Sequence, residues 1–260
     1  YKTDKKNKVE EPKAKTTPDL AQLNKYINST SEEYDSEDDP IPVVNFDNEL
    51  KYAPGVKSVD IVFVIDCTGS MNPFFEGIKK WVRKLARDAE KCLSQYISDE
   101  EKLALGIVMY RDHPPQDKSF VTGTLQLTHD YSLFKRTVCE MKASGGGDQP
   151  EAVLDGLYEA ILGIKWRSDS EKFIYHILDA PPHGKDFSNM EDGFKNGCPC
   201  GKNWDEVLLK MREKEIDYTV IKLSNDIDRM ILKFSEYVRV DVATPTIASD
   251  DNISREQDNS

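Results

Sequence analysis

Residues 59–70, Val-Asp-Ile-Val-Phe-Val-Ile-Asp-Cys-Thr-Gly-Ser, decide the fold of this chain. From Val59 to Ile65 the sequence is a nearly continuous run of Val, Ile and Phe, which is typical of a central strand buried on both faces. The run ends abruptly at Asp66, and apolar side chains then recur at helical spacing as far as about Leu93. The stretch therefore predicts a buried strand followed by an amphipathic helix, the repeating unit of an α/β sheet.

The same alternation of strand and helix patterns continues along the chain. Further strands are expected at 103–110, 121–127, 173–178, 218–223 and 238–242, and further helices at 131–141, 150–161, 204–211 and 227–234. Pro150 stands where a first-turn proline would start its helix. The pattern predicts an α/β fold: a doubly wound, mostly parallel six-stranded sheet with helices on both faces and one short antiparallel edge strand.

Composition divides the chain into three regions. Residues 1–57 form a polar, charged arm, which we expect to be disordered or extended on a partner, because it has too little apolar surface to offset its ordering entropy. Residues 58–245 form the α/β domain, and residues 246–260 form an acidic polar tail.

Charge and cysteine content limit the classes of partner. The chain has 47 acidic and 35 basic residues and a net charge of −12, so nucleic acid and anionic lipid are not expected partners. Its longest apolar run is far shorter than the roughly 18 residues that a membrane-spanning helix needs, so we expect a soluble chain. Five scattered cysteines favour a reducing compartment, and we expect a cytoplasmic protein. Because the sequence begins at Tyr1, a preceding segment stays possible.

Oxygen-bearing side chains follow the predicted strands at the points where these end. Asp66, Thr68 and Ser70 follow the first strand, Asp179 follows strand 173–178, and Glu151 ends the segment 145–151, which leads into a helix. Ligands of open sheets bind beyond the carboxyl ends of the strands, so we expect these loops to converge. One carboxylate and two hydroxyls suit a hard cation, and a compact octahedral set favours magnesium. The alternative is that the first three residues only cap the next helix.

The sequence resembles a known family at these residues. Asp66-Cys67-Thr68-Gly69-Ser70 is similar to the Asp-x-Ser-x-Ser metal-ion-dependent adhesion site (MIDAS) of von Willebrand factor type A domains, and 145–151 is similar to the Asp-x-Pro-Glu loop of integrin beta subunits. The segments 110–113 (Tyr-Arg-Asp-His), 179–184 and 197–201 (Gly-Cys-Pro-Cys-Gly) resemble the A domains of alpha-type protein kinases and their relatives. The resemblance covers roughly residues 58–244.

This resemblance implies a Rossmann-like von Willebrand A fold that holds Mg²⁺ at the edge of the sheet, with Ca²⁺ or Mn²⁺ as alternatives. The second loop departs from the commonest pattern, in which a threonine supplies a ligand. Asp148 and Glu151 stand there instead, and the integrin comparison favours Glu151 as a direct ligand with Asp148 near it. A further carboxylate lowers the net charge of the site and should weaken its attraction for an acidic ligand. The other implied ligands are Asp66, Thr68, Ser70 and Asp179.

The leading hypothesis is a non-catalytic, magnesium-dependent protein-interaction module. It would bind an acidic side chain of a protein partner within a larger intracellular complex. One alternative is the regulatory A domain of an alpha-type protein kinase whose catalytic domain lies outside these residues. Another is a structural subunit whose amino-terminal arm wraps neighbours and whose metal site is vestigial.

Other chemistries have less support in the sequence. A haloacid-dehalogenase-type phosphatase needs a second aspartate where Thr68 stands. The chain has neither a Walker phosphate loop nor a dinucleotide fingerprint. We interpret Cys198 and Cys200 as loop thiols, because a zinc site needs four ligands and only His176 or His183 offers itself.

Overall fold

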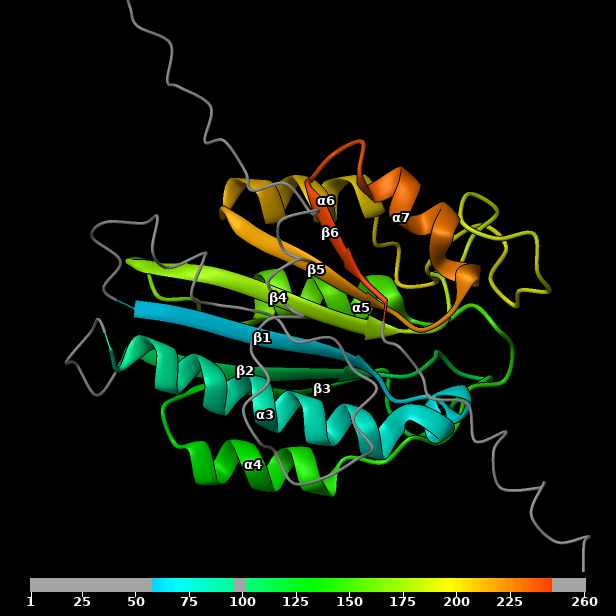
Figure 1. The fold of residues 1–260 in the computed structure, drawn as a ribbon. Helices are drawn as coiled ribbons and strands as arrows, with labels where there is room; N and C mark the ends of the chain where they lie inside the picture. Colours follow the sequence, from blue (N-terminus) through cyan, green and yellow to red (C-terminus); the bar gives the residue numbers. More distant parts are fainter. Residues whose placement is uncertain (1–57, 96–101, 245–260) are drawn as a thin grey trace, which may run out of the picture. The chain divides into compact units, whose positions relative to one another are not determined.

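The computed structural model describes residues 58–95 and 102–244 (Figure 1). The predicted arm at 1–57 and the predicted tail at 246–260 lie outside the described residues. The strands are β1 (Ser58–Asp66), β2 (Leu103–Tyr110), β3 (Thr122–Thr128), β4 (Ser170–Leu178), β5 (Ile216–Lys222) and β6 (Val240–Ala243). The helices are α3 (Phe75–Leu93), α4 (Tyr131–Glu140), α5 (Val153–Tyr158), α6 (Trp204–Glu213) and α7 (Asp228–Phe234), with the short turns η1 (Gly69–Phe74), η2 (Glu159–Gly163) and η3 (Asn225–Ile227).

The strands form one sheet in the order β3-β2-β1-β4-β5-β6. Every neighbouring pair is parallel except β2 and β3, which are antiparallel. The predicted fold class is therefore confirmed, including the antiparallel edge strand. The chain winds outward in both directions from β1 and β4, and the switch point where open α/β sheets bind ligands lies between these two strands.

The central strand β1 is buried on both faces of the sheet. Phe63 and Ile65 belong to the apolar cluster that contains α3 and α4, whereas Val62 and Val64 belong to the cluster that contains α5, α6 and α7. Figure 1 shows α3 and α4 together on one side of the sheet. Because side chains alternate between the faces of a strand, both faces of β1 must be apolar, which explains the continuous run in the sequence. Among the described residues, no helix combines the length and the apolar character needed to cross a bilayer.

The helix after the glycine-rich loop begins later than the sequence predicts. The expected start is Pro150, but α5 begins at Val153 and continues into the π-helical turn η2. Glu151 instead forms a β-bridge with Pro182, and its N–H donates a 3.0 Å hydrogen bond to the carbonyl of Pro181. A short strand-like pairing beyond β4, not a helical turn, therefore positions the Glu151 side chain.

Candidate functional site

The first loop of the site follows β1. Asp66 is fully buried, and its Oδ1 accepts hydrogen bonds from the N–H (2.8 Å) and the Oγ1 (2.6 Å) of Thr68. Thr68 Oγ1 lies 3.2 Å from Ser70 Oγ, so the predicted carboxylate and two hydroxyls are brought together. Thr68 is the N-cap residue of η1, but its side chain makes no capping hydrogen bond. Helix capping therefore does not account for Thr68.

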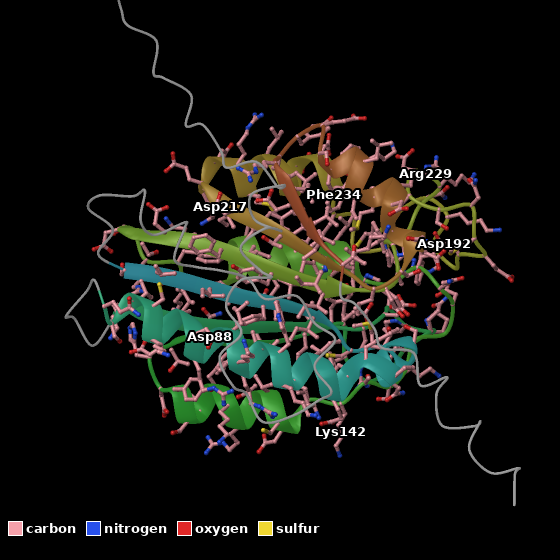
Figure 2. All side chains as sticks on the ribbon, in the orientation of Figure 1. Asp88, Lys142, Asp192, Asp217, Arg229 and Phe234 are labelled. Atoms are coloured by element: carbon pink, nitrogen blue, oxygen red, sulfur yellow. The ribbon has the colours of Figure 1, made fainter. Side chains whose placement is uncertain are left out.

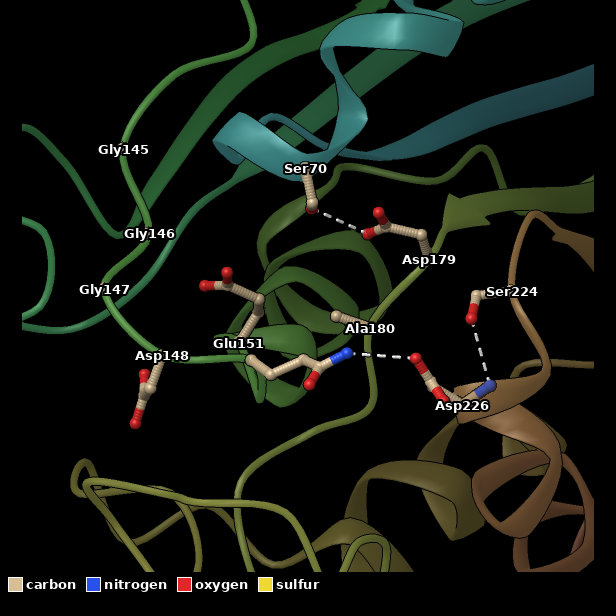
Figure 3. A pocket seen from close by; sticks show the side chains of 11 residues that line it. Ser70, Gly145, Gly146, Gly147, Asp148, Glu151, Asp179, Ala180, Ser224 and Asp226 are labelled. Carbon is tan, nitrogen blue, oxygen red and sulfur yellow. Dashed lines mark hydrogen bonds between the residues drawn. The ribbon is translucent and has the colours of Figure 1, made fainter.

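The third loop brings Asp179 to the same place. Asp179 comes directly after β4, the neighbour of β1, and its Oδ1 accepts a 3.0 Å hydrogen bond from Ser70 Oγ (Figure 3). The register pairs Ile65 of β1 with Ile177 of β4, so both strands end at the same edge of the sheet. Two carboxyl groups far apart in sequence therefore meet at the switch point.

The second loop supplies Glu151, whose side chain is buried beside the glycine-rich segment. Gly145 and Gly146 have φ angles of +81° and +76°, a left-handed conformation that glycine adopts without strain. The carbonyl of Gly145 accepts a 3.0 Å hydrogen bond from the N–H of Gly69, which joins the first two loops. A Cβ atom at Gly146 would lie 2.7 Å from Glu151 Oε1, so glycine lets the backbone pass close to this carboxyl group.

Two charged residues after β2 hold these loops in place. Arg111 donates from Nε to the carbonyl of Cys67 (3.1 Å) and from a terminal nitrogen to the carbonyl of Lys142 (3.0 Å). Asp117 Oδ2 accepts a 3.3 Å hydrogen bond from the N–H of Gly146. Sequence reasoning did not assign a role to Asp117, because no periodicity marks the loop in which it lies.

Asp148 borders the site, but its carboxylate turns toward a different part of the domain. Its Oδ2 accepts a hydrogen bond from the N–H of Gly193, and the carboxyl group lies within 4.8 Å of ligand atoms of His183 and Asp192. In Figure 3 the Asp148 side chain points away from Ser70 and Asp179. The structure thus gathers the other predicted site residues closely and leaves Asp148 at the margin.

The carboxyl groups of the site are crowded and incompletely paired. Burial, with a smaller contribution from neighbouring carboxylates, raises the pKa of Asp66 to about 7 despite the hydrogen bonds from Thr68. Burial and the charge of Asp66 raise the pKa of Glu151 to about 10, and burial also raises the pKa of Asp179. Asp66 Oδ2 and Glu151 Oε2 are buried and make no hydrogen bond. A buried carboxylate without a partner is costly, so this arrangement fits a cation.

A pocket of about 420 Å³ opens at Ser70, Glu151 and Asp179 (Figure 3). Most of the side chains that line it are polar or acidic, and it extends from the switch point toward the loop after β5. The lining residues are Ser70, Gly145, Gly146, Gly147, Asp148, Gln149, Glu151, Asp179, Ala180, Ser224 and Asp226.

A histidine bonded to two aspartates, His183, lies near Asp148 at the margin of the site. His183 Nε2 lies 2.7 Å from Asp112 Oδ1, and His183 Nδ1 lies 2.9 Å from Asp192 Oδ1. Burial by itself would lower the pKa of His183, but the bonds and charges of Asp112 and Asp192 outweigh it and raise the pKa. Figure 2 shows Asp192 near the carboxyl ends of the strands. The sequence shows the Arg-Asp-His segment after β2 that contains Asp112, but it does not show that Asp112 pairs with His183.

Together the fold and the site define a Rossmann-like α/β domain with an oxygen-rich site at its topological switch point. The profile of the von Willebrand factor A domain matches residues 60–192, just over half of the 260-residue chain. The chain therefore belongs to the von Willebrand factor A domain family.

Two curated proteins with different names contain a segment similar to this chain. The chain is 35% identical over 160 residues to alpha-protein kinase vwkA of Dictyostelium discoideum, covering 62% of this chain and 24% of the relative. It is 29% identical over 136 residues to an ariadne-like RING finger protein of Acanthamoeba polyphaga mimivirus, covering 52% of this chain and 12% of the relative. The chain thus spans a quarter or less of the length of these curated relatives.

Similar solved structures include two bacterial proteins. BatB of Bacteroides thetaiotaomicron gives a TM-score of 0.40 at 19% identity, covering 64% of this chain and 66% of that chain. The pilus adhesin SpaC of Lactobacillus rhamnosus GG, in an open conformation, gives a TM-score of 0.41 at 15% identity, covering 65% and 24%.

Proposed function

We propose that this domain is a non-catalytic protein-interaction module that holds one divalent cation and uses it to bind an acidic side chain of a protein partner. In this proposal Asp66, Thr68, Ser70 and Asp179 hold the cation, with help from Glu151. The observation that carries the proposal is the convergence of three crowded carboxyl groups from three separate loops, two of which have buried oxygens without a hydrogen bond.

The donor set favours magnesium. The described lining of the pocket offers carboxylate and hydroxyl oxygens and includes no histidine or cysteine, which is the set that a hard cation prefers. Calcium and manganese bind related oxygen sets and belong in the test. A bound cation would supply positive charge that attracts an oxygen of the partner. The carboxylates of Asp66, Glu151 and Asp179 would then repel one another less, and the buried oxygens of Asp66 and Glu151 that lack a hydrogen bond would gain a partner.

Charge makes the cation decisive for an acidic partner. Asp148, Glu151, Asp179 and Asp226 all line the pocket, and the chain has a net charge of −12. This surface without a cation repels a carboxylate, so binding of an acidic group should require the metal. Glu151 adds one more negative charge, which predicts weaker attraction for the partner than a site with a threonine in the second loop. Asp148 stays a predicted outer member of the site.

The names of the relatives support a shared binding role. The matching segment occurs in a protein named as a kinase and in a protein named as a RING finger protein, and it is a minor part of each. We take a segment that such different proteins share to be an interaction domain rather than the part that carries out either activity. We include in the proposal that the domain works in the cytoplasm as part of a larger complex.

The test is capture of partners by the immobilised chain in magnesium buffer and again with chelator. We expect specific partners to bind the wild type only with magnesium and not to bind the variant Asp66→Ala. Asp88→Ala is the matched control, because Asp88 lies on α3 and its carboxylate pairs with Lys84 rather than with any residue of the site. Capture of the same proteins by Asp66→Ala, or by the wild type in chelator, would contradict the proposal.

The similarity to vwkA favours a second candidate, a regulatory domain of an alpha-type protein kinase. In this version the same site would bind a partner or substrate of the kinase. The encoded protein beyond residues 1–260 decides it: a kinase domain there supports the candidate, and its absence there removes it.

A further inference from the structure

Four side chains outside the pocket form a second group of potential ligands, which we call the thiol cluster: His113, Asp155, Cys198 and Cys200. One ligand atom of each lies within 4.8 Å of those of the others. They come from three places: the loop after β2, helix α5, and the long segment 179–203 between β4 and α6. None of the four lines the pocket described above.

The distances within the thiol cluster are close to those of a shared metal. Cys198 Sγ donates to Asp155 Oδ2 at 3.0 Å, and His113 Nε2 lies 2.9 Å from the same oxygen. Cys198 Sγ lies 3.7 Å from His113 Nε2, and Cys200 Sγ lies 3.8 Å from His113 Nδ1. Two ligands of one zinc ion at a tetrahedral angle lie roughly 3.3 to 3.8 Å apart. The two contacts to Asp155 are shorter than this, and Cys200 approaches the other ring nitrogen of His113. Outward movement of the carboxylate and a shift of Cys200 toward Nε2 would therefore complete a tetrahedral site.

We propose that the thiol cluster is a structural zinc site with two cysteine ligands, one histidine ligand and one aspartate ligand. Thiolate and imidazole donors select zinc over magnesium or calcium, which prefer oxygen. Four protein ligands leave no open position, which is the mark of a structural rather than a catalytic zinc site. The proposal is independent of the function proposed for the pocket.

The charges around the thiol cluster balance when zinc is bound. Cys198 and Cys200 would release their thiol protons to solvent, and His113 would bind as the neutral ring. Two thiolates and the carboxylate of Asp155 then exceed the charge of the zinc ion by one negative charge. Lys202 Nζ donates to Asp155 Oδ1 and supplies the matching positive charge, while Asp155 Oδ2 faces the sulfur and the ring.

The local backbone is arranged to present both cysteines. Gly197 and Gly201 bracket the Cys-Pro-Cys sequence with φ angles of +105° and +70°, a region that favours glycine. The N–H of Gly201 donates a 2.9 Å hydrogen bond to the carbonyl of Cys198, which closes a tight turn. This turn brings both sulfur atoms within reach of His113.

The two histidines considered in the sequence analysis are engaged elsewhere. His176 is fully buried and lies between the hydroxyls of Tyr110 (3.1 Å from Nε2) and Tyr218 (2.7 Å from Nδ1). His183 is bonded to two aspartates, as described above. His113 is the histidine that lies beside the thiols, a proximity that no sequence pattern indicates.

Zinc at this position would fasten a long segment to the rest of the domain. Segments of this length without helix or strand are uncommon and usually have a function or an added constraint. Segment 179–203 also contributes Gly193, which bonds Asp148, and Asp192, which bonds His183. The zinc site would therefore stabilise the loop that supports one margin of the pocket.

The test is zinc binding by the whole chain, purified under reducing conditions, stripped with chelator, and titrated with zinc alone against a chromophoric competitor. We expect one zinc per chain, and cobalt in its place should give the thiolate-to-metal absorption of a tetrahedral site. Cys200→Ser should weaken zinc binding beyond the roughly 100-fold effect of losing an outer-shell partner and should reduce the thiolate absorption. Because Cys200 is exposed, this variant should fold, and circular dichroism checks it.

Cys139→Ser is the matched control, because Cys139 is another exposed cysteine but lies on α4 outside the thiol cluster. It should bind zinc as the wild type does. The proposal would be overturned if Cys200→Ser and the double variant Cys198→Ser, Cys200→Ser both bound zinc as tightly as the wild type does. Cobalt binding without thiolate absorption would overturn it as well.

Discussion

The pocket and the thiol cluster both contain buried acids, but they balance the charge in opposite ways. Glu151 in the pocket has a buried oxygen without a hydrogen bond, and burial with nearby carboxylates raises its pKa to about 10. Asp155, four residues later, belongs to the thiol cluster. Burial alone would raise its pKa, but hydrogen bonds from His113, Lys202 and Cys198 outweigh burial and lower the pKa to about 2. Two acids near one helix start therefore have opposite electrostatic environments.

This difference separates a site whose buried acids lack hydrogen-bond partners from one whose acid is already paired within the protein. In the pocket, charge repulsion and unpaired oxygens raise the free energy of the folded protein, and the proposed cation would offset this cost. In the thiol cluster, hydrogen bonds satisfy Asp155 before any metal arrives, so zinc would add a constraint to an existing arrangement. Local destabilisation of this kind is typical of functional sites, and the pocket is therefore the better candidate for partner binding.

The largest expected effect is a separation of the two metals. Asp66→Ala should weaken magnesium binding by more than about 100-fold, because it removes a direct ligand rather than an outer-shell partner. The same variant should bind zinc as the wild type does, since Asp66 is not part of the thiol cluster. Calorimetric titration of each metal into stripped protein measures both. Loss of both metals in this variant would show that the two regions do not act separately.

The next effect concerns stability without metal. Asp66→Asn removes a buried charge that lacks a full set of partners, and it should raise the free energy of unfolding by about 2 kcal/mol at neutral pH. Asp155→Asn removes a charge that is well paired, and it should lower the free energy of unfolding by about 2 kcal/mol. Urea unfolding in chelator measures both variants. Changes of the same sign would show that the two acids do not differ as the structure indicates.

A smaller effect is expected from two glycines with similar backbone angles. Gly146→Ala and Gly201→Ala both place alanine at a left-handed φ, of +76° and +70°, so each should lower the unfolding free energy by about 1 kcal/mol. Only at Gly146 would the new Cβ meet Glu151 Oε1, whereas Gly201 has open space around it. Gly146→Ala should therefore weaken magnesium binding by about 10-fold, as displacement of a supporting group does.

The magnesium affinity of Gly201→Ala should equal that of the wild type, which makes it the control for backbone strain. Calorimetry for affinity and urea unfolding for stability are needed on both variants. Equal magnesium affinities in the two variants would argue against Glu151 as a participant in the site.

The sequence predicted those parts of the site that follow from strand ends. Asp66 and Asp179 come directly after buried runs, and parallel neighbouring strands bring such positions together regardless of the loops. The bounds of β1 and β2 were also predictable, because both strands are apolar over nearly their whole length, whereas β4 begins at Ser170 rather than at the predicted residue 173. The predicted start of α5 at Pro150 was wrong. The β-bridge between Glu151 and Pro182, a contact between residues distant in sequence, prevents the helix from beginning there.

The sequence did not predict the parts that depend on how loops dock. His113 and Cys198 are far apart in sequence, and no hydrophobic period fixes the path of either segment. Asp117 supports the glycine-rich loop through one backbone hydrogen bond, which leaves no trace in composition or spacing. Loops are positioned by tertiary contacts rather than by local pattern, so only the folded structure reveals these neighbours.

The smallest effect comes from His176 in the core, which sets the baseline for any pH study of either region. Burial lowers the pKa of His176 to about 3, compared with about 6.5 when the chain is unfolded. The unfolded state then binds the proton more readily, so stability falls as the pH drops below about 6.5 and stops falling near 3. Between about pH 7 and about pH 6 this amounts to about 0.7 kcal/mol.

His176→Gln should remove this part of the acid sensitivity, because glutamine does not titrate. The variant should also be less stable than the wild type at neutral pH, since it cannot satisfy both Tyr110 and Tyr218 as the histidine ring does. The stability gap between the two proteins should therefore narrow as the solution is acidified. Urea unfolding across this pH range, in chelator, measures the gap. A gap that stays constant would mean that His176 is not the group responsible. The acid sensitivity would then have to be sought among carboxyl groups whose pKa the fold lowers, such as Asp155, because the raised pKa values of Asp66 and Glu151 make acidification stabilising.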